Sequence, residues 1–362
     1  MGYQIDFLGV GAESKSGDAI AIRFGNLHGN REEQVVVVID GGFKDTGDEL
    51  VNHIVTHFGT RIVDLVISTH PDQDHINGLE TVLSELTVNE LWMHLPWQHN
   101  AGLASKFEDG RVTDNSLGEQ LKESLEKAYG LYKVAQAQRV NVKEPFLGLV
   151  DVSGCVKVLG PSEQYYEGLI PSFDGMAGPK QQARTRPVGL LERAMQQLRK
   201  IFVSWGEDKI SDDGVTSAKN NASVITQLII DGRRFVFTAD AGVEALGHAA
   251  DQLDQCPDPA SLTFIQVPHH GSQRNVGPSV LNRLVGEPIA EGETRDIIAI
   301  ASTAKQGDPK HPRKAVVNAF THRGARVLAT RGSCICHHND APRREGWGPV
   351  TAEPYYFELD ED

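Results

Sequence analysis

The chain has 362 residues, of which 40% are hydrophobic and 23% are charged, and its formal net charge is −14. This length is enough for one large domain or two ordinary ones, and the composition is that of a globular protein. The negative charge disfavours a broad grip on duplex nucleic acid, which requires a basic face. Since uninterrupted apolar runs stay well below 18 residues, we expect no membrane span.

The first residues and the number of cysteines predict the cellular compartment of the protein. The N-terminus goes straight into strand-like sequence, without the basic region and apolar core of a secretory signal. Four cysteines in this length do not make a disulfide framework. We therefore expect a cytoplasmic protein in a reducing compartment.

The first part of the chain predicts alternating strands and helices. Gln34 to Asp40 is β-branched almost throughout, which is typical of a buried strand, and it ends at the sharp turn Gly41-Gly42. Ile62 to Thr69 is a second apolar run of this kind. The other strands expected here cover residues 4–10, 19–24 and 88–95, and the expected helices cover residues 49–59 and 78–86.

The middle of the chain changes character. Residues 115–129 predict an amphipathic helix, with leucine at every fourth position from Leu117 to Leu125. Residues 160–217 are punctuated by Gly and Pro, with one helix expected at 190–202. We interpret residues 97–140 and 165–215 as insertions in a single domain of residues 1–362. The insertions could form a cap over a site or bind a protein partner.

The strand pattern resumes after this stretch. Strands are expected at residues 224–230, 234–238, 262–267, 297–301 and 326–330, a strand pair at 144–159, and helices at 242–255, 277–284 and 313–323. Strands at both ends with helices between them favour two sheets packed face to face with helices outside. We expect this αββα sandwich of the α/β class to carry polar clusters in loops at one edge of its sheets.

The most informative polar cluster directly follows the apolar run that ends at Thr69. It is His70-Pro71-Asp72-Gln73-Asp74-His75, in which four potential metal ligands occupy six residues. Imidazole nitrogen and carboxylate oxygen suit Zn or Mn better than a thiolate-seeking ion. The alternative is a polar loop with Pro71 as its turn residue.

Two further clusters follow predicted strands. Asp240 stands just before a small-residue turn, where its carboxylate could bridge two metals, cap a helix, or do both. His269 and His270 follow the strand at 262–267. Because neighbouring side chains project in different directions, one of them could bind metal while the other meets the substrate; two surface histidines are the alternative.

Weaker signals leave more alternatives open. Asn220 and Asn221 could be weak ligands, could donate to a phosphate, or could serve a turn. His311 is either a site residue or part of a loop. Cys334, Cys336, His337 and His338 could hold zinc, but no second cysteine pair follows at the required spacing, and reduced thiols are the alternative. Two basic clusters are either solvated faces or binding surfaces: Lys180, Arg184, Arg186, Arg193, Arg199 and Lys200, and Arg323, Arg326, Arg331, Arg343 and Arg344.

Taken in order, the ligand loop, Asp240 and His269 resemble the metallo-β-lactamase fold superfamily. The usual loop motif of that superfamily is His-x-His-x-Asp-His, and Asp72 here replaces the second His. The His-Pro-Asp-x-Asp-His form is similar to the branch that contains the metallo-hydrolase domain of the competence protein ComEC. Further pieces that match this branch are Gly17-Asp18-Ala19-Ile20, Val38-Ile39-Asp40-Gly41-Gly42, Asn220-Asn221-Ala222-Ser223, Thr238-Ala239-Asp240, Pro268-His269-His270-Gly271-Ser272 and His311-Pro312.

The resemblance implies two divalent metal ions, Zn or Mn. One would be bound by His70 and Asp72, the other by Asp74, His75 and His269, with Asp240 as the bridge. The superfamily commonly has another histidine shortly before the Asp240 strand, where this chain has Asn220 and Asn221. The first metal position would therefore be poor in nitrogen, which favours Mn over zinc.

The same resemblance implies a metal-dependent hydrolase, most simply a two-metal phosphodiesterase or nuclease acting on nucleic acid or nucleotides. Two close cations would convert a shared water to hydroxide at neutral pH, and the hydroxide would attack phosphorus in line. The expected catalytic residues are Asp74, His270, Lys305 and His311, with Ser272 as a further phosphate contact and Asp40 orienting a ligand histidine. The alternatives are a hydrolase for a lactone, thioester or amide, and a non-catalytic or partner-dependent subunit.

Overall fold

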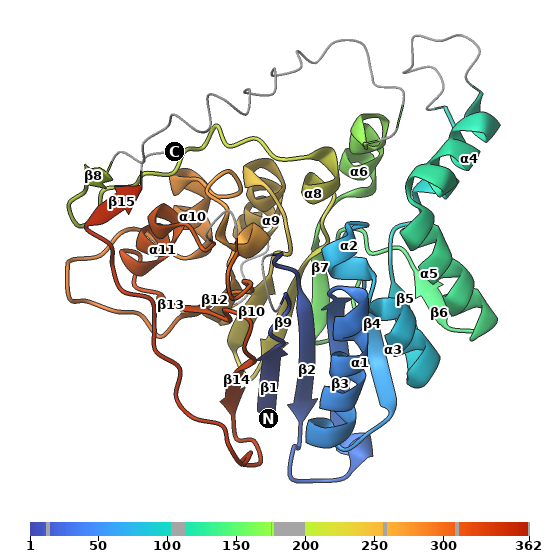
Figure 1. Cartoon of the computed structure of the whole chain (residues 1–362), viewed down its shortest axis with the longest axis horizontal. Helices are drawn as coiled ribbons and strands as arrows, with labels where there is room; N and C mark the ends of the chain where they lie inside the picture. The colour runs from blue at the N-terminus through green and yellow to red at the C-terminus, as the bar shows by residue number, and fades with distance from the viewer. Residues whose placement is uncertain are drawn as a thin grey trace.

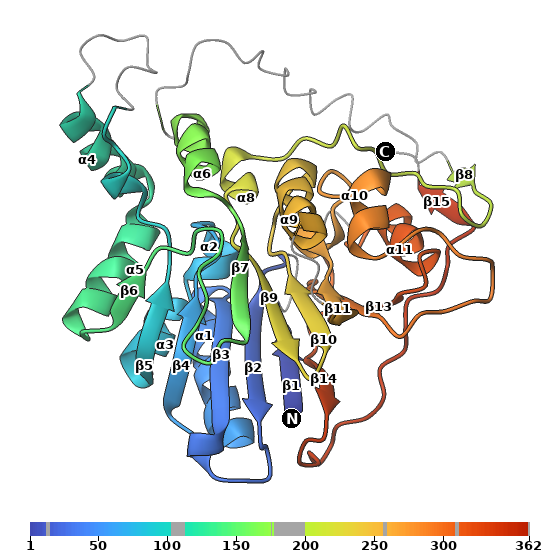
Figure 2. The ribbon, with the colours of Figure 1, turned by 180° about the vertical axis from the view of Figure 1, so that it is seen from behind.

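The computed structural model describes residues 1–11, 15–102, 113–174, 176, 200–255, 259–307 and 311–360. Two large β-sheets lie face to face in the middle of the molecule, and helices cover the outer face of each (Figures 1 and 2). Side chains from both sheets meet in a shared apolar layer that includes Phe7, Trp92 and Phe264. The αββα sandwich expected from the sequence is therefore confirmed.

The first sheet has seven strands in the order β14-β1-β2-β3-β4-β5-β6. Its first strands pair antiparallel, and from β3 to β6 the pairing is parallel. The continuous apolar runs predicted to be buried strands form its centre, since both faces of the sheet are covered. The strands are β1 (Gly2–Phe7), β2 (Ala19–Gly25), β3 (Gln34–Gly41), β4 (Ile62–Ile67), β5 (Thr87–Trp92), β6 (Asn141–Lys143) and β14 (Ile335–Asn339).

The second sheet has six strands in the order β13-β12-β11-β10-β9-β7. Strands β10 to β13 are parallel, and β9 pairs antiparallel with both of its neighbours. The strands are β7 (Val156–Gly160), β9 (Ile225–Ile230), β10 (Arg233–Phe237), β11 (Ser261–Gln266), β12 (Ile298–Ala301) and β13 (Arg326–Ala329). A separate pair joins β8 (Lys200–Phe202) to β15 (Glu358–Asp360).

Each outer apolar layer is closed by its own group of helices. The layer on the first sheet packs helices α1 (Lys44–His53), α3 (Leu79–Glu85), α4 (Asp114–Ser124), α5 (Glu126–Ala137) and α6 (Glu163–Leu169). The layer on the second sheet packs α9 (Val243–Gln255), α10 (Pro278–Leu284) and α11 (Lys314–Thr321). Shorter turns are η1 (Arg31–Glu33), the π-type η2 (Ile54–Phe58), α2 (Gln73–Ile76), η3 (Pro96–Gln98), η5 (Ile170–Ser172), α8 (Ala218–Asn221) and η6 (Pro268–Gly271).

Several sequence predictions of local structure need correction. The helix expected at 115–129 is two helices, because Leu125 leaves the helical conformation (φ −114°, ψ 42°), and this bend lets leucines of both helices enter one apolar layer. The helix expected at 49–59 begins earlier, at Lys44. Of the strand pair expected at 144–159, only β7 forms, with one isolated bridge from Val150 to Lys157.

The helix predicted at 190–202 lies mostly outside the described residues. Its last three residues, Lys200–Phe202, form strand β8 rather than helix because β15 pairs with them. The local helical preference of a short segment is weak against such a tertiary partner. Among the described residues, none of the helices combines the length and apolar character needed to cross a bilayer.

The second basic cluster is largely occupied by internal ion pairs. Arg323 is 1% exposed and pairs with Asp208, while Arg344 is 8% exposed and pairs with Asp6. The exposed Arg331 pairs with Glu353. Arg323 and Arg344 therefore stabilise the fold, whereas Arg326, Arg331 and Arg343 are exposed. The first cluster lies outside the described residues except for Lys200.

Candidate metal centre

The direction of the strands brings the polar clusters to one end of the sandwich. Strands β3 and β4 run parallel, and so do β10 and β11, so each pair sends its carboxyl-end loops to the same edge. The ligand loop follows β4, Asp240 follows β10, and His269 follows β11. The short helices α2 and α8 gather at this end of the sheets (Figure 1). Loops at this edge therefore supply the site.

Four imidazole nitrogens surround the carboxylate of Asp240, whose side chain is 3% exposed. On one side, His269 Nε2 and His70 Nε2 lie 3.3 and 3.9 Å from Oδ2. On the other side, His75 Nε2 and His270 Nε2 lie 3.4 and 3.9 Å from Oδ1. Asp240 thus stands in the middle of the cluster, with two histidines beside each oxygen.

Asp72 and Asp74 lie beside different histidine pairs around Asp240. Asp72 Oδ2 lies 3.8 Å from His70 Nε2, and Asp74 Oδ2 lies 3.9 Å from His75 Nε2 and 3.6 Å from His270 Nε2. Asp72 is the N-cap of α2, but its carboxylate makes no capping hydrogen bond and faces the cluster instead. One aspartate of the loop therefore lies toward each side of Asp240.

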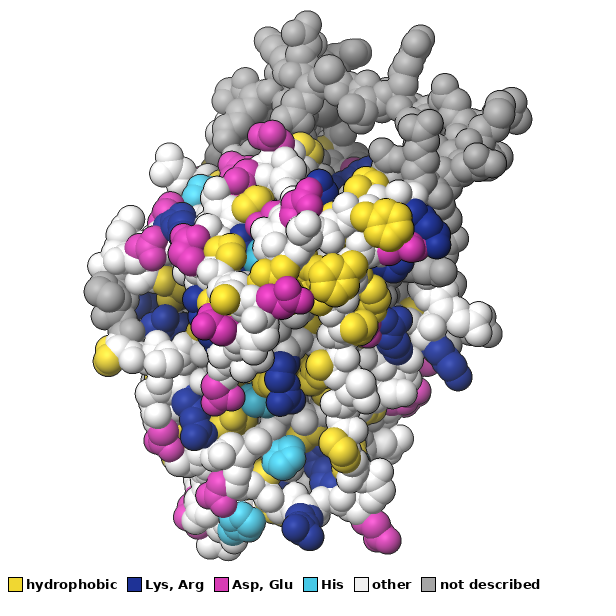
Figure 3. All heavy atoms as spheres, turned by 90° about the vertical axis from the view of Figure 1, so that its left-hand side faces the viewer, with side chains coloured by type: hydrophobic (Ala, Val, Ile, Leu, Met, Phe, Trp, Pro, Cys, Tyr) yellow, Lys and Arg dark blue, Asp and Glu magenta, His cyan; other side chains and the backbone are white. Residues whose placement is uncertain are grey.

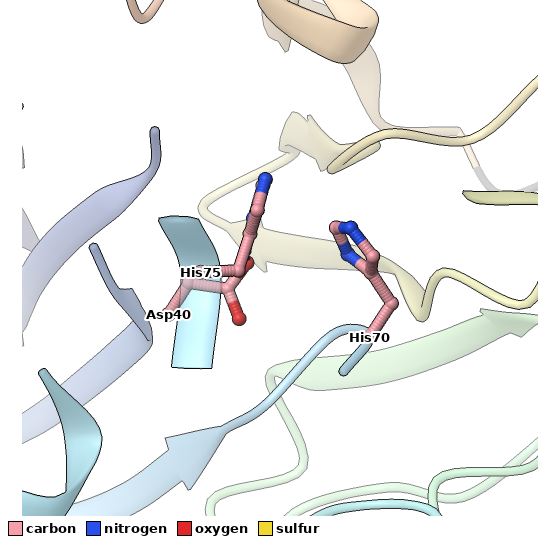
Figure 4. A group of neighbouring side chains, drawn as sticks. All are labelled: Asp40, His70 and His75. Carbon is pink, nitrogen blue, oxygen red and sulfur yellow. Dashed lines mark hydrogen bonds and ion pairs between the residues drawn. The ribbon is translucent and has the colours of Figure 1, made fainter. Parts of the chain in front are cut away.

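Hydrogen bonds fix the orientation of the two loop histidines. His75 Nδ1 donates to Asp40 Oδ2 at 2.8 Å. The Thr69 hydroxyl donates to the same oxygen at 2.6 Å, so it accepts from His70 Nδ1 at 3.1 Å. Figure 4 shows Asp40 beside His75, with His70 next to them. Because each Nδ1 carries the proton, each Nε2 presents its lone pair, as a metal-binding imidazole requires.

The other two histidines are oriented in the same way. His270 Nδ1 donates to the Ser302 carbonyl at 2.9 Å. His269 Nδ1 lies 3.0 Å from Asn275 Oδ1. The amide oxygen of Asn275 faces His269 because its nitrogen, Nδ2, donates to the Asp240 carbonyl. All four Nδ1 atoms are therefore engaged, and all four Nε2 atoms face Asp240.

The atoms that face one another at the centre lack hydrogen-bond partners. They are buried polar atoms of five side chains: His70 Nε2, His75 Nε2, His270 Nε2, Asp240 Oδ1 and Asp18 Oδ1. Burying polar atoms without partners is costly, and such atoms rarely cluster without a reason. A divalent cation would satisfy them, and imidazole nitrogen with carboxylate oxygen is a donor set for Zn or Mn. The residues present therefore fit a metal centre.

Backbone strain is concentrated at the same place. Asp40, Ala239, His269 and His270 have φ values of 55°, 46°, 45° and 57°, a left-handed conformation that residues other than glycine rarely adopt. Such strain clusters at functional sites, where the surrounding structure enforces it. At Ala239, Gln266 Oε1 accepts from the backbone N–H groups of both Thr238 and Ala239 and thereby fixes the turn that presents Asp240.

Burial and mutual charge shift the pKa values within the cluster. Burial is the largest influence on His270 and lowers its pKa, but carboxylates led by Asp240 outweigh it and raise the pKa to about 9. Burial raises the pKa of Asp74, but His75 and His270 outweigh it and bring the pKa to about 2. A proton on His270 thus offsets part of the carboxylate charge when no cation is bound, and a cation would replace that proton.

Asp18 is the site residue that the sequence reasoning missed. It is buried, Gln266 Nε2 donates to its Oδ2 at 2.9 Å, and its Oδ1 has no partner. Burial is the largest influence on its carboxyl group and raises the pKa to about 6. Asp18 precedes β2, whose antiparallel pairing with β3 brings its amino end to the edge where the other clusters lie. The available signal was an acidic residue directly before a strand that begins with four apolar residues, Ala19 to Ile22.

The remaining predicted site residues lie at different distances from this centre. Asn220 Nδ2 lies 3.2 Å from His269 Nδ1, whereas Asn221 Oδ1 packs against the Gly242 turn. Ser272 N donates to the His269 carbonyl. Burial lowers the pKa of His311 to about 4, with a smaller contribution from nearby His270. Lys305 is exposed, and its backbone N–H lies 3.4 Å from the Gly11 carbonyl.

The cysteine and histidine run near the C-terminus has a different environment. Cys336 and His337 are neighbours on strand β14, so their side chains point to opposite faces of the sheet. His337 stacks on Phe264 between the sheets, and Cys336 lies against Asp6. Among the described residues, the groups close enough to share a cation do not include them.

Comparison with known proteins gives little further information. No protein-family model and no curated protein matches the chain. Among solved structures, the chain is similar to a candidate metallo-beta-lactamase from Thermotoga maritima, with 12% identity over 66% of this chain and 79% of that one. The TM-score of that match is 0.32.

Proposed function

We propose that this protein is a metal-dependent hydrolase that uses two divalent cations, Zn or Mn, to cleave a phosphodiester bond in nucleic acid or a nucleotide. The observation that carries this proposal is the convergence of four oriented Nε2 atoms on the buried carboxylate of Asp240. The loop and strand motifs that resemble the metallo-β-lactamase superfamily, and its ComEC-like branch in particular, support the same class of chemistry.

Two cations bound here would supply hydroxide from water at neutral pH and offset the charge that develops on the phosphoryl oxygens. The chain's own residues would hold that arrangement. Asp240 spans both sides of the cluster, and Asp40 keeps His75 in the metal-binding tautomer. In the reaction, a P–O bond to water oxygen forms, the P–O bond to the leaving group breaks, and the leaving oxygen gains a proton.

A phosphodiester is favoured by the acidic ligand loop and by a lysine at its rim. Lys219 Nζ lies 3.9 Å from Asp72 Oδ1 and 3.9 Å from Asp174 Oδ2, and its side chain is 15% exposed. A cation so placed can contact an anionic substrate oxygen. Nothing in the local sequence distinguishes Lys219 from a surface lysine.

The surface favours a small or single-stranded substrate. The net charge of −14 opposes a broad grip on a duplex. On the face over α10, α11 and β8–β15, Lys and Arg side chains are interspersed with Asp and Glu (Figure 3). We therefore propose that recognition is confined to the neighbourhood of the metal centre.

The two insertions would form part of the substrate site within one domain. A cavity of about 20 Å³, enough for one water molecule, adjoins His70. Its walls include Ala128 from α5 and Tyr166 from α6, which belong to the first and second insertion. The position of both insertions beside this cavity supports a cap over the site. We also propose a cytoplasmic location, because the low cysteine count is typical of proteins from a reducing compartment.

The test combines metal analysis with an activity screen. Purified protein would be loaded with Mn or Zn, its metal content measured by mass spectrometry, and then incubated with labelled single-stranded DNA, RNA and cyclic nucleotides. We expect two ions per chain and cleavage of at least one of these. If two ions are bound and only a lactone, thioester or amide is hydrolysed, the phosphodiester assignment is wrong. Protein that binds no divalent metal would refute the whole proposal.

A further inference from the structure

A buried histidine outside the metal cluster has two ring nitrogens without partners. His94 is 8% exposed, and neither its Nδ1 nor its Nε2 has a hydrogen-bond partner among the described residues. It follows β5, which runs parallel to β4, so it lies at the same edge of the sheet as the ligand loop. Burying an imidazole without partners is costly, so the two nitrogens indicate that a ligand binds to this side chain.

The cavity beside His70 is the place where such a ligand would bind. His94 lines this cavity together with His70 and Pro71 of the ligand loop. The wall also includes the apolar side chains of Met93 and Ala128. The volume of about 20 Å³ admits one water-sized group. A group bound here would therefore lie beside the metal centre, in largely apolar surroundings, and could be no larger than a single hydroxyl.

The surroundings of His94 fix its ring and keep it neutral. The ring stacks on Tyr166 with 4.1 Å between the centroids and 28° between the planes, and its centroid lies 4.8 Å from that of Phe146. Burial lowers the pKa of His94 to about 3, and the neighbouring His99 lowers it further. A neutral imidazole has one nitrogen that donates a hydrogen bond and one that accepts. His94 therefore offers both functions in fixed directions.

These properties favour an uncharged hydroxyl group as the ligand. A hydroxyl donates and accepts, so it suits either nitrogen of His94. An anion can only accept, and in a largely apolar cavity it would lose its hydration without a positive charge to balance it. Among the described residues, the groups that are close enough to share a cation do not include His94, so the site does not have the ligands of a metal ion.

We propose that this cavity binds the 2′-hydroxyl of a ribose whose phosphate lies at the metal centre, and that His94 thereby makes the protein select ribonucleotides over deoxyribonucleotides. This inference rests on the proposed phosphodiesterase function. In a ribonucleotide, the 2′-hydroxyl and the 3′-phosphate stand on adjacent carbons, so a phosphate held beside His70 brings the hydroxyl close to the cavity. The 2′-hydroxyl is also the group by which proteins distinguish RNA from DNA. A water molecule offers the same hydrogen-bonding chemistry, so the experiments must distinguish it from the substrate hydroxyl.

The first test compares substrates that differ in this one hydroxyl. Metal-loaded protein would be given a single-stranded oligonucleotide with ribose, 2′-deoxyribose or 2′-O-methylribose beside the scissile phosphate. We expect kcat/KM to be at least roughly tenfold higher for the ribose form, because the deoxyribose form leaves His94 unpaired. The O-methyl form should be as poor as the deoxyribose form, since its methyl group exceeds the cavity. Equal cleavage of the ribose and deoxyribose forms would overturn the inference and leave the proposed function intact.

Variants of the cap test the role of His94 itself. His94→Phe keeps an aromatic ring against Tyr166 but removes both nitrogens, so the ratio of kcat/KM for ribose and deoxyribose should fall close to one. His94→Gln returns a donor and an acceptor and should restore part of that ratio. The matched control is His248→Phe, which alters an exposed histidine 4.5 Å from the Tyr165 ring and should keep the wild-type ratio. An unchanged ratio in folded His94→Phe protein, as judged by circular dichroism, would refute the proposal.

Binding gives a second measurement that does not require turnover. Calorimetry of the metal-loaded protein with adenosine and uridine 3′-monophosphates should show at least roughly tenfold tighter binding than with their 2′-deoxy analogues. Equal affinities, or no binding of either form, would overturn the inference. A crystal structure with the tighter ligand should place its 2′-oxygen within hydrogen-bond distance of a His94 nitrogen, and a water molecule found there instead would also overturn it. Protein that binds two ions and cleaves no phosphodiester refutes the proposed function, whereas the affinities decide the cavity separately.

Discussion

Two clusters in this protein combine histidines with carboxylates and differ in how their nitrogen atoms are used. In the cluster around His99, Nε2 lies 3.0 Å from Glu144 Oε2 and Nδ1 lies 3.1 Å from Glu167 Oε1. In the cluster around Asp240, each histidine has a partner at Nδ1 and none of the Nε2 atoms makes a described hydrogen bond. The first cluster is a closed ion pair, and the second is a shell of inward-facing ligand atoms.

The difference shows that proximity of histidine and acidic side chains does not by itself indicate a metal site. His99, Glu163 and Glu167 are close enough to share a cation. However, the His99 imidazole is already bound on both sides, and hydrogen bonds led by that to Glu144 raise its pKa to about 9. It thus carries its own positive charge. It joins the start of the first insertion to the residues after β6 and to α6, which is a structural role.

The largest effect is expected from Asp240→Ala. Because this carboxylate lies between both histidine pairs, its removal should abolish binding of both ions and with it the metal-dependent activity. Mass spectrometry of zinc-loaded protein measures the first result. Glu167→Gln changes the other cluster and should keep full metal content. If Glu167→Gln loses as much bound zinc as Asp240→Ala, the two clusters do not differ as metal sites.

A smaller effect is expected from Asp40→Asn. Asp40 accepts from the Thr69 backbone N–H and hydroxyl and from His75 Nδ1, so an amide group would leave donors facing one another. Loss of the oriented His75 tautomer should weaken one metal position by roughly 10- to 100-fold. Calorimetric titration with zinc measures it.

A matched control exists for that variant. Asp151 is also a buried carboxylate that accepts hydrogen bonds from its own turn, at Ser153 and Val156. Asp151→Asn should lower the melting temperature but leave both zinc affinities unchanged. If Asp40→Asn behaves like this control, Asp40 has only a structural role.

The His99 cluster should show a pH dependence that the metal centre does not cause. The folded-state pKa of about 9 exceeds the usual value of about 6.5, so the stabilisation is complete below pH 6.5. It should disappear as the pH rises through 9. In metal-free protein, the melting-temperature difference between wild type and His99→Gln should therefore shrink from pH 6 to pH 10. A difference that stays constant would contradict a protonated imidazole.

The smallest effect is expected from Glu163→Gln. Its carboxylate is 3.9 Å from His99 Nδ1 and its side chain is 63% exposed, so water screens the pair. The free energy of unfolding in urea should change by less than about 0.5 kcal/mol, with metal content unchanged. A larger loss would mean that Glu163 completes the His99 cluster as Glu144 and Glu167 do.

The sequence determined the layered fold and the position of the ligand loop. The β-branched run within residues 34–40 favours a buried strand, and polar residues directly after such a strand are expected at the edge of the sheet. In the structure, His70 and His75 both lie within 4 Å of Asp240, and Asp74 lies within 4 Å of His75. The local sequence could not predict the break at Leu125 or the strand at Lys200–Phe202, because packing partners far away in the chain decide both.

Only the tertiary structure decided how the ligand atoms are distributed. Asp18 reaches the centre because β2 runs antiparallel to β3, a pairing direction that the local sequence does not specify. His269 and His270 separate because contacts with Ala239, Asn275 and Ser302 hold two residues in a conformation they would not adopt alone. Periodicity and residue type fix which groups lie at the edge of a sheet, whereas ring orientation depends on hydrogen bonds between segments that are distant in sequence.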